Sequence, residues 1–289
     1  MAADFWEGLR LATRARVGLG RSGDAMRLSD VLDFQMAHAV ARDAVHTPLD
    51  VAALRADLAP LESVEVRSAA GDRGTYLRRP DLGRRLAPES RALLRRGGYD
   101  AVFVIGDGLS ALAVQKHAAP VLHATLERLR GWRIAPVVVA TQARVALGDE
   151  IGEALGATLC AMLIGERPGL SVAESLGVYL TYAPRTGCQD SGRNCISNIH
   201  GQGGLSHEGA AEKLAWLMRE ARQRKLSGIG LKDEAPAALP GAEERPGGGS
   251  TSTRDHRKCH ALSAGCRYGP GSNGPASARR SGHAAPRRP

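Results

Sequence analysis

Short apolar runs alternate with amphipathic stretches through the middle of the chain, and this alternation constrains the fold more than any other feature. The apolar runs have the length of buried strands and cover residues 101–105, 135–140, 158–164 and 178–182. Patterns of helical period lie between or after them at 109–130, 145–155 and 206–222. Strands that are apolar on both faces and separated by helices are typical of a parallel sheet covered on both sides. The sequence therefore predicts an α/β fold, with a doubly wound, mostly parallel, Rossmann-like sheet over residues 97–234.

The regions on either side of this predicted domain differ from it. Residues 1–96 form a predicted helical N-terminal region, with helices at 5–14, 28–39, 50–58 and 83–95 and a hairpin around the Gly-Asp-Arg-Gly turn at 71–74. Asp50 here and Ser206 in the next domain are predicted helix N-caps. Residues 235–289 hold nine Gly and seven Pro and almost no large apolar side chains. Such a segment buries too little apolar surface to offset its ordering entropy, so we expect a disordered basic tail.

The distribution of charge narrows the class of function. The net charge is +9, but nine Lys/Arg against three Asp/Glu lie after residue 234, so the rest of the chain carries only about +3. This balance argues against a nucleic-acid-binding fold. No run approaches the roughly 18 apolar residues that a membrane span needs, and the first seven residues lack the pattern of an export signal. We therefore expect a cytoplasmic protein that binds neither nucleic acid nor membrane, with its five scattered cysteines as free thiols.

Polar turns follow two of the predicted strands at the edge where open α/β sheets bind ligands. The turn at 105–110, Ile-Gly-Asp-Gly-Leu-Ser, either binds a ligand or is a tight turn in which Asp107 or Ser110 caps the next helix. The loop at 165–170 projects Glu166 and Arg167 from the same edge. Because a purely structural turn needs neither charge, we predict a ligand or interface role for this loop.

Two further motifs favour structural interpretations. Residues 18–23 match the dinucleotide fingerprint G-x-G-x-x-G, but a basic helical pattern precedes them where the fingerprint needs a buried strand. Asp149 and Glu153 lie four residues apart and resemble a pair of catalytic or metal-binding carboxylates. Without a nearby histidine, they are better interpreted as the solvated, acidic start of a helix.

Cysteine and histidine occur together in two places. Cys195 and His200 would suit a nucleophile and its base, but no acid at a known spacing supports the pair. In the tail, the spacing of His256, Cys259, His260 and Cys266 fits no standard zinc site. We therefore predict no catalytic side chain and no metal ligand on this chain.

Several strings along the chain occur in a characteristic order and spacing. They are TRARVGLGRSG at 13–23, LDFQ at 32–35, ARDAVH at 41–46, YLRRPDLGRRL at 76–86, DGLS at 107–110, GDEIG at 148–152, GERPGL at 165–170, YAPR at 182–185 and CISNI at 195–199. Each alone is weak, but together they resemble the small (light) subunit of ethanolamine ammonia-lyase. The resemblance runs from about residue 6 to 233, roughly four fifths of the chain.

The resemblance implies a lyase whose adenosylcobalamin lies between a large barrel subunit and this smaller α/β subunit. The large subunit holds ethanolamine and most catalytic groups, and the cobalt cofactor drives its radical conversion to acetaldehyde and ammonia. By position, the small-subunit cofactor contacts fall on Val145, Glu166 and Cys195. The resemblance also assigns residues 1–96 to docking on the large subunit. It implies a location in the cytoplasm, and leaves open one inside a bacterial microcompartment.

One further consequence of the resemblance concerns the cofactor itself. The chain lacks the Asp-x-His-x-x-Gly string with which other B12 folds replace the cofactor's own base, so the dimethylbenzimidazole tail is expected to stay near cobalt. The alternative is a stand-alone α/β nucleotide-binding protein or enzyme that uses the loops of Asp107 and Glu166. A visible corrinoid spectrum after mixing with cobalamin would separate the two.

Overall fold

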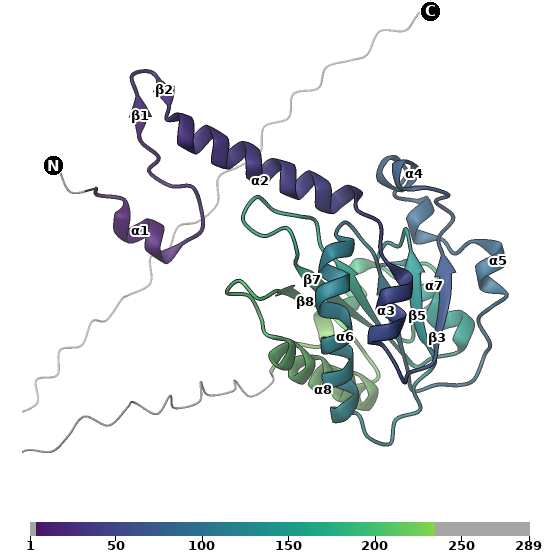
Figure 1. Ribbon diagram of the computed structural model, residues 1–289. Coiled ribbons are helices and arrows are strands. Elements are labelled where there is room, and N and C mark those ends of the chain that lie inside the picture. The colour runs from purple at the N-terminus through teal and green to yellow at the C-terminus, as the bar shows by residue number, and fades with distance from the viewer. Residues whose placement is uncertain (1–3, 235–289) are drawn as a thin grey trace, which may run out of the picture. The chain divides into compact units, whose positions relative to one another are not determined.

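The computed structural model describes residues 4–234 (Figure 1). The helices are α1 (Glu7–Ala12), α2 (Leu28–His46), α3 (Val51–Asp57), α4 (Arg73–Arg78), α5 (Pro88–Arg91), α6 (Ala111–Arg128), α7 (Leu147–Leu155) and α8 (His207–Arg224). The strands are β1 (Arg21–Ser22), β2 (Ala25–Met26), β3 (Ser63–Arg67), β4 (Ala101–Gly106), β5 (Val137–Thr141), β6 (Leu159–Gly165), β7 (Leu176–Tyr182) and β8 (Arg193–Ile199). The predicted tail at 235–289, with His256, Cys259, His260 and Cys266, lies outside the described residues.

Six strands form the main sheet, in the order β3-β5-β4-β6-β7-β8. Strands β3, β5, β4 and β6 are parallel, whereas β7 and β8 are antiparallel to their neighbours. The predicted α/β class and mostly parallel sheet are confirmed. The strand at 178–182 was expected to be parallel and is not, because the connection at 166–175 contains no helix and a parallel pair needs a longer crossover. The antiparallel strands β7 and β8 and the order of the strands both differ from a dinucleotide-binding sheet. The Rossmann-like detail is therefore not confirmed.

Helices cover both faces of the sheet. Alternate residues of β4 show why: Phe103 and Ile105 pack with α3, α6 and α8, whereas Val102 and Val104 pack with α7. All six residues of β4 are buried, as expected for a central strand with apolar side chains on both faces. The two cores hold the carboxyl ends of β4, β5 and β6 in fixed positions along one edge.

The region before residue 97 was predicted less well. It contains α1, α2 and α3, but it also supplies β3 to the main sheet, so its description as a helical region is not confirmed. The predicted hairpin around 71–74 is wrong. Asp72 Oδ1 instead accepts the backbone N–H of Thr75 at 2.9 Å and starts α4, and β3 finds its partner in distant β5. The predicted caps are confirmed, since Asp50 accepts from Ala53 N at 2.9 Å and Ser206 from Gly209 N at 3.1 Å.

Strand β8 lies at the edge of the sheet and is covered by the segment that follows α8. The side chain of Asn194 donates to the carbonyl oxygen of Leu231 at 2.7 Å and accepts the backbone N–H of Gly228 at 2.8 Å. Ser227 Oγ accepts from Tyr182 N at 2.8 Å and donates to the carbonyl of Gly192 at 2.6 Å. These bonds tie the start of β8 and the end of β7 to the segment that follows α8.

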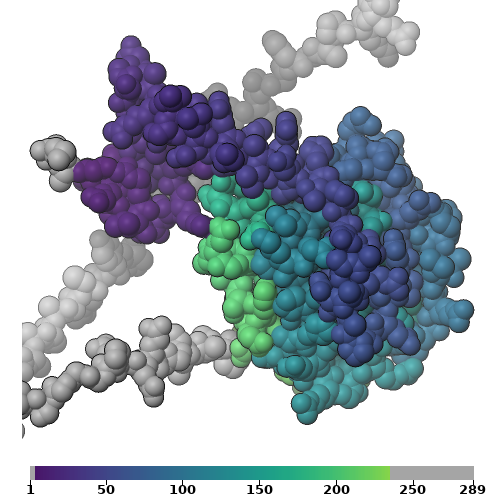
Figure 2. All heavy atoms as spheres, viewed as in Figure 1, coloured from purple at the N-terminus to yellow at the C-terminus, as the bar shows by residue number. Residues whose placement is uncertain are grey.

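Helix α2 exposes an unusual amount of apolar surface. Leu28, Leu32, Phe34, Met36 and Val40 are all at least 45% exposed. Figure 2 shows α2 in purple, open on the face in view. Within residues 4–234, α2 is among the longest helices, yet neither it nor any other is long and apolar enough to cross a membrane.

Candidate functional site

A cleft of about 330 Å³ lies where β4 and β6 end. The residues that line it include Tyr76, Leu109, Arg144, Val145, Glu166 and Tyr179. A second cleft of about 440 Å³ shares Arg144, Val145 and Tyr179 with the first and extends past Pro80 to Asp190. Both clefts lie at the carboxyl edge of the parallel strands, where open α/β sheets bind ligands.

The turns after β4 and β6 touch at the floor of the first cleft. The backbone N–H of Leu109 donates to the carbonyl of Gly165 at 2.9 Å. Gly108 has φ +56°, and a Cβ there would lie 2.2 Å from the oxygen of Gly165. Glycine is therefore required at position 108 both by its backbone conformation and by the close approach of the second turn.

The structure shows which side chain of the turn at 105–110 caps the next helix. Ser110 caps α6, because its Oγ accepts the N–H of Ala113 at 3.2 Å. Asp107 caps nothing in α6; its buried carboxylate accepts the N–H groups of Gln142 and Ala143, each at 2.9 Å. Burial raises the pKa of Asp107, while these two backbone bonds and Arg73 oppose the shift. The turn thus has a structural role, since it connects the loops after β4 and β5, and its residues Gly108 and Leu109 also line the cleft.

Glu166 faces the cleft from the turn after β6. Its Oε2 accepts the hydroxyl of Ser175 and, at 3.3 Å, the N–H of Asn198, so the carboxylate joins β7 to the end of β8. Among the described residues, Oε1 has no hydrogen-bond donor. Glu166 therefore has one structural oxygen and one that is free to accept a bond from a ligand.

Cys195 lies on β8 directly opposite Tyr179 of β7. Burial raises the pKa of the Cys195 thiol, and the influence of Tyr179 opposes this only in part. Burial also raises the pKa of Tyr179 to about 12, with Cys195 and Glu166 adding to the shift. Both groups are protonated at neutral pH. A protonated thiol is a poor nucleophile, which agrees with the rejection of a Cys195–His200 pair.

The structure thus brings Val145 and Glu166 into one cleft, whereas Cys195 is not among the lining residues and lies on β8 opposite Tyr179, which lines that cleft. Their assignment to a cofactor stays a prediction. Sequence reasoning missed Tyr76, Arg144 and Tyr179 as lining residues. A signal existed for Tyr179, because it is an aromatic side chain with a polar hydroxyl inside an otherwise apolar strand.

The interpretation of Asp149 as part of a solvated helix start is wrong. Asp149 is buried and forms a bidentate pair with Arg193 of β8, with bonds of 2.5 and 2.7 Å. Arg193 also donates to the carbonyl of Cys188 and to the hydroxyl of Thr181. Glu153 does lie at the surface, where it accepts two bonds from Thr186. The G-x-G-x-x-G segment at 18–23 was expected to be a loop between helices; it opens no helix, but it contains β1 of the β1–β2 hairpin.

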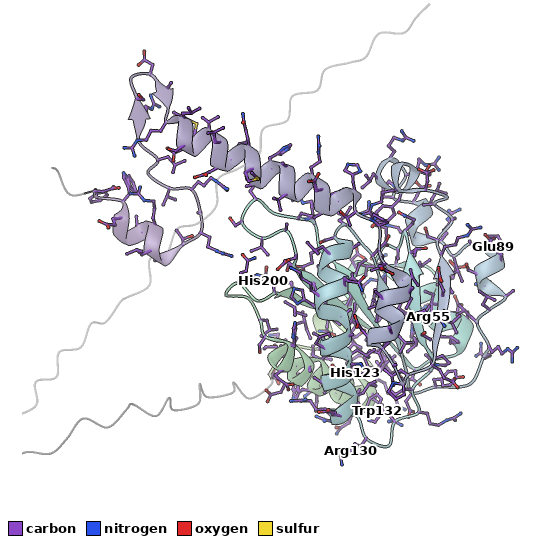
Figure 3. All side chains as sticks on the ribbon, viewed as in Figure 1. Arg55, Glu89, His123, Arg130, Trp132 and His200 are labelled. Carbon is purple, nitrogen blue, oxygen red and sulfur yellow. The ribbon has the colours of Figure 1, made fainter. Side chains whose placement is uncertain are left out.

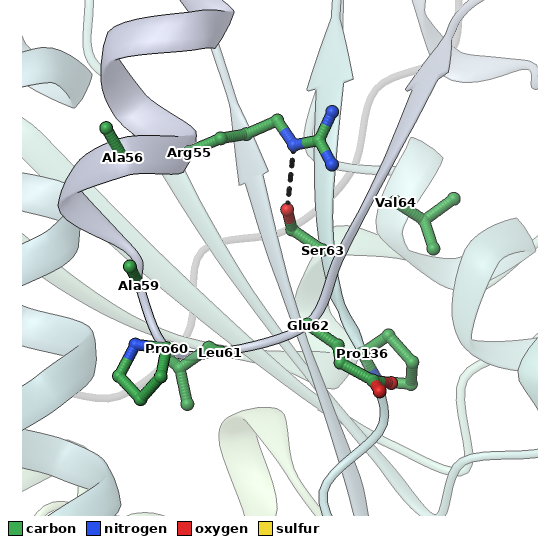
Figure 4. A pocket seen from close by; sticks show the side chains of 9 residues that line it. All are labelled: Arg55, Ala56, Ala59, Pro60, Leu61, Glu62, Ser63, Val64 and Pro136. Carbon is green, nitrogen blue, oxygen red and sulfur yellow. Dashed lines mark hydrogen bonds between the residues drawn. The ribbon is translucent and has the colours of Figure 1, made fainter.

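A larger cleft of about 680 Å³ lies at the opposite edge, where β3 begins (Figure 4). Arg55 and Glu62 are its charged lining residues, and Arg55 Nε donates to Ser63 Oγ at 2.9 Å. Figure 3 shows Trp132 and Arg130 toward this edge, with His200 nearer the other. Because the amino ends of parallel strands seldom carry ligand sites, we place the candidate site at the carboxyl edge despite its smaller volume.

Comparison with known proteins gives consistent matches over the same part of the chain. The family model described as Ethanolamine ammonia-lyase light chain (EutC) matches residues 3–232. The ethanolamine ammonia-lyase small subunit of Azotobacter vinelandii is 54% identical over 253 residues, which cover 84% of this chain and 93% of that protein.

Two other relatives have the same description. The small subunit of Xanthomonas campestris pv. campestris is 52% identical over 250 residues, covering 83% of this chain and 92% of that protein. The small subunit of Pseudomonas fluorescens is 53% identical over 240 residues, covering 80% and 87%. With a family model that spans most of the sequence and relatives that match along nearly their whole length, the chain belongs to the family of ethanolamine ammonia-lyase light chains.

Proposed function

We propose that this chain is the small subunit of an adenosylcobalamin-dependent ethanolamine ammonia-lyase and forms one wall of the cofactor site. The observation that carries the proposal is the meeting of Val145 and Glu166 in one cleft, with Cys195 opposite the lining residue Tyr179 on the neighbouring strand. Val145 and Glu166 come from the loops after β5 and β6, whereas Cys195 lies within β8. Membership of the light-chain family supports the same role.

The side chains of the cleft fit one side of a corrinoid. Val145 offers half-buried apolar surface to the ring, and the free Oε1 of Glu166 is an acceptor for the N–H groups of the corrin's amide side chains. The clefts of about 330 and 440 Å³ have the size that suits drug-like ligands, and cobalamin is far larger. This chain would therefore bind one side of the cofactor while a second protein surface encloses the other.

When bound, the cofactor supplies hydrogen abstraction through cleavage of its cobalt–carbon bond. The part of this chain is to bind and orient it. Tyr179 and Cys195, both protonated, add weak polar contacts without taking up protons at neutral pH. We assign substrate binding to the large subunit.

We propose that the exposed apolar side chains of α2 contact the large subunit. Five large apolar side chains on one helix exceed what a surface helix usually exposes, and such patches mark interaction sites. The assignment of residues 1–96 to docking, and the division at residue 97, stay predictions, as does a location in the cytoplasm or inside a microcompartment.

Ammonia-lyase turnover is expected only when this chain, a large subunit and adenosylcobalamin are combined. Because the proposed role of this chain is to bind the cofactor, its activity alone should be indistinguishable from buffer. An assay of acetaldehyde formation with each component omitted in turn tests this. Turnover by the purified chain alone, or by the large subunit and cofactor without it, would refute the proposed role.

Replacing Glu166 with leucine is expected to weaken cobalamin retention by the two-subunit complex. A lost hydrogen bond to a charged group costs about 1.5–3 kcal/mol, or roughly ten- to a hundredfold in affinity. Cys195→Ala should do less, because a thiol is a weak hydrogen-bonding partner. Equilibrium titration followed by the corrinoid spectrum measures both.

The matched control is Glu89→Leu, since Glu89 is an exposed carboxylate paired with Arg67 away from the cleft. Because Glu166 also joins β7 to β8, the melting temperature of each variant should be measured in parallel. Unchanged cobalamin affinity in a folded Glu166→Leu variant would show that the assignment of this residue is wrong.

A further inference from the structure

Arg144 lines both clefts of the candidate site, and no acidic side chain among the described residues forms an ion pair with it. It directly precedes Val145 in the loop between β5 and α7. No role for Arg144 follows from the family resemblance or from the comparisons.

Three contacts hold Arg144 in place. Its backbone N–H donates to the carbonyl of Gly83 at 2.8 Å. Gly83 also makes room for the aliphatic stem, because a Cβ there would lie 2.9 Å from Cγ of Arg144. The guanidinium lies 4.3 Å from the ring centroid of Tyr76, whose hydroxyl donates to the carbonyl of Ala143 at 3.0 Å. The side chain is therefore pre-organised rather than free to rotate.

This pre-organised cation has no partner of opposite charge. Within residues 4–234, the guanidinium of Arg144 donates no hydrogen bond and forms no ion pair, and its Nε is buried without an acceptor. Arg73, which also stacks on Tyr76, is different: it pairs with Asp107 and donates to the carbonyls of Gly108 and Val45. A buried donor without an acceptor is costly, and a charged one more so. Arg144 thus has the features of a group whose partner arrives with a ligand.

We infer that Arg144 binds the phosphodiester of the cofactor's nucleotide tail. This inference rests on the proposed function. Cobalamin's peripheral amides are neutral, and its phosphodiester is the one anionic group on its periphery. A guanidinium matches phosphate oxygens with two parallel N–H bonds, which a neutral amide cannot use as fully. Arg144 and Glu166 then have complementary parts, a cation for the anionic tail and a carboxylate for amide N–H groups.

Cobinamide tests this assignment, because it keeps the corrin ring and amides but lacks the phosphate and nucleotide. The two-subunit complex is titrated with cobalamin and with cobinamide, for the parent chain, Arg144→Gln, Arg144→Lys and Arg130→Gln. Arg130 is exposed near the opposite edge of the sheet (Figure 3) and controls for the loss of one positive charge. Melting temperature and subunit association are measured for each.

Arg144→Gln is expected to weaken cobalamin binding roughly ten- to a hundredfold, the range for a lost hydrogen bond to a charged group, and to leave cobinamide binding nearly unchanged. Arg144→Lys should lose less, since it keeps the charge without the two-pronged geometry. Arg130→Gln should change neither. The parent's cobalamin affinity should also fall more steeply with added salt than that of Arg144→Gln, which decides the matter if cobinamide proves too weak to titrate.

Any of three results would overturn the inference. They are an equal loss of affinity for cobalamin and cobinamide in Arg144→Gln, an equal salt dependence of cobalamin affinity in the parent and Arg144→Gln, and no loss of cobalamin affinity at all. So would a defect confined to subunit association or to melting temperature, because Arg144 would then serve the interface or the fold. If the parent complex retains no cobalamin, the proposed function fails and the inference fails with it. If the parent retains cobalamin and Arg144→Gln does too, only the inference fails.

Discussion

Replacement of Arg193 by methionine is expected to lower the free energy of unfolding by about 3–5 kcal/mol, because it leaves Asp149 buried without its partner. Both side chains are no more than 3% exposed, so water cannot replace the lost bonds. The pair joins α7 to β8, and Arg193 also ties the loop before β8 through Cys188. Chemical denaturation monitored by circular dichroism measures the loss.

The same substitution should change how stability depends on pH. Burial raises the pKa of the Asp149 carboxyl, and the hydrogen bonds from Arg193 oppose that shift, so removing Arg193 raises the pKa further. Below about pH 3.9, the ordinary pKa of aspartate, the carboxyl is protonated in both folded and unfolded chains and the deficit is smallest. As pH rises, the unfolded chain ionises first, and the deficit grows.

A double variant provides the control. Asp149→Leu combined with Arg193→Met removes both charges and should be more stable than Arg193→Met alone, because no unpaired ion remains in the interior. If the double variant were instead less stable than the single one at neutral pH, the cost would come from packing and not from the stranded carboxylate.

Gly108→Ala is expected to destabilise the chain by about 2–5 kcal/mol and to abolish cofactor retention. The residue has φ +56°, which strains any side chain, and the new Cβ would lie 2.2 Å from the backbone oxygen of Gly165. Because the obstacle is backbone, no rotamer change can relieve it. The turns after β4 and β6 must move apart, and the floor of the cleft with them.

Gly131 offers a matched control, with φ +81° and no heavy atom within 4 Å of the position that a new Cβ would take. Gly131→Ala should cost only the backbone strain, about 1–2 kcal/mol, and leave cofactor binding unchanged. Melting curves and cobalamin titrations of the two variants separate strain from displacement of the turns. Equal effects on both measurements would mean that contact between the turns is unimportant.

Features encoded by neighbouring residues could be predicted from the sequence, and features that depend on distant partners could not. The caps at Asp50 and Ser206 depend on backbone groups three residues away, and both were predicted. The strand at 63–67 was assigned to a hairpin because its true partner, β5, begins 70 residues later. Strand β8 was missed because its burial does not alternate, and a register shift opposite Leu176 and Val178 interrupts the pattern.

In the candidate site, too, the features encoded by neighbouring residues could be predicted and those that depend on distant partners could not. The loop of Glu166 could be placed at the carboxyl edge, because the end of an apolar run is a local signal. Nothing local indicates that Arg144 would stack on Tyr76, 68 positions earlier, or that Asp149 would be neutralised by Arg193. Charged residues are ambiguous in a sequence, since the pattern around a solvated carboxylate and a buried paired one can be the same.

The segment that covers β8 has a consequence for biosynthesis. The side chain of Asn194 in β8 bonds with Gly228 and Leu231, and the carbonyl of Gly192 just before the strand accepts from Ser227; these three partners are synthesised more than 30 residues later. A nascent chain emerges from the ribosome amino end first, so the parallel strands are available long before this edge can be completed. Strand β8 therefore acquires this support late in translation, after the parallel strands of the sheet have been synthesised.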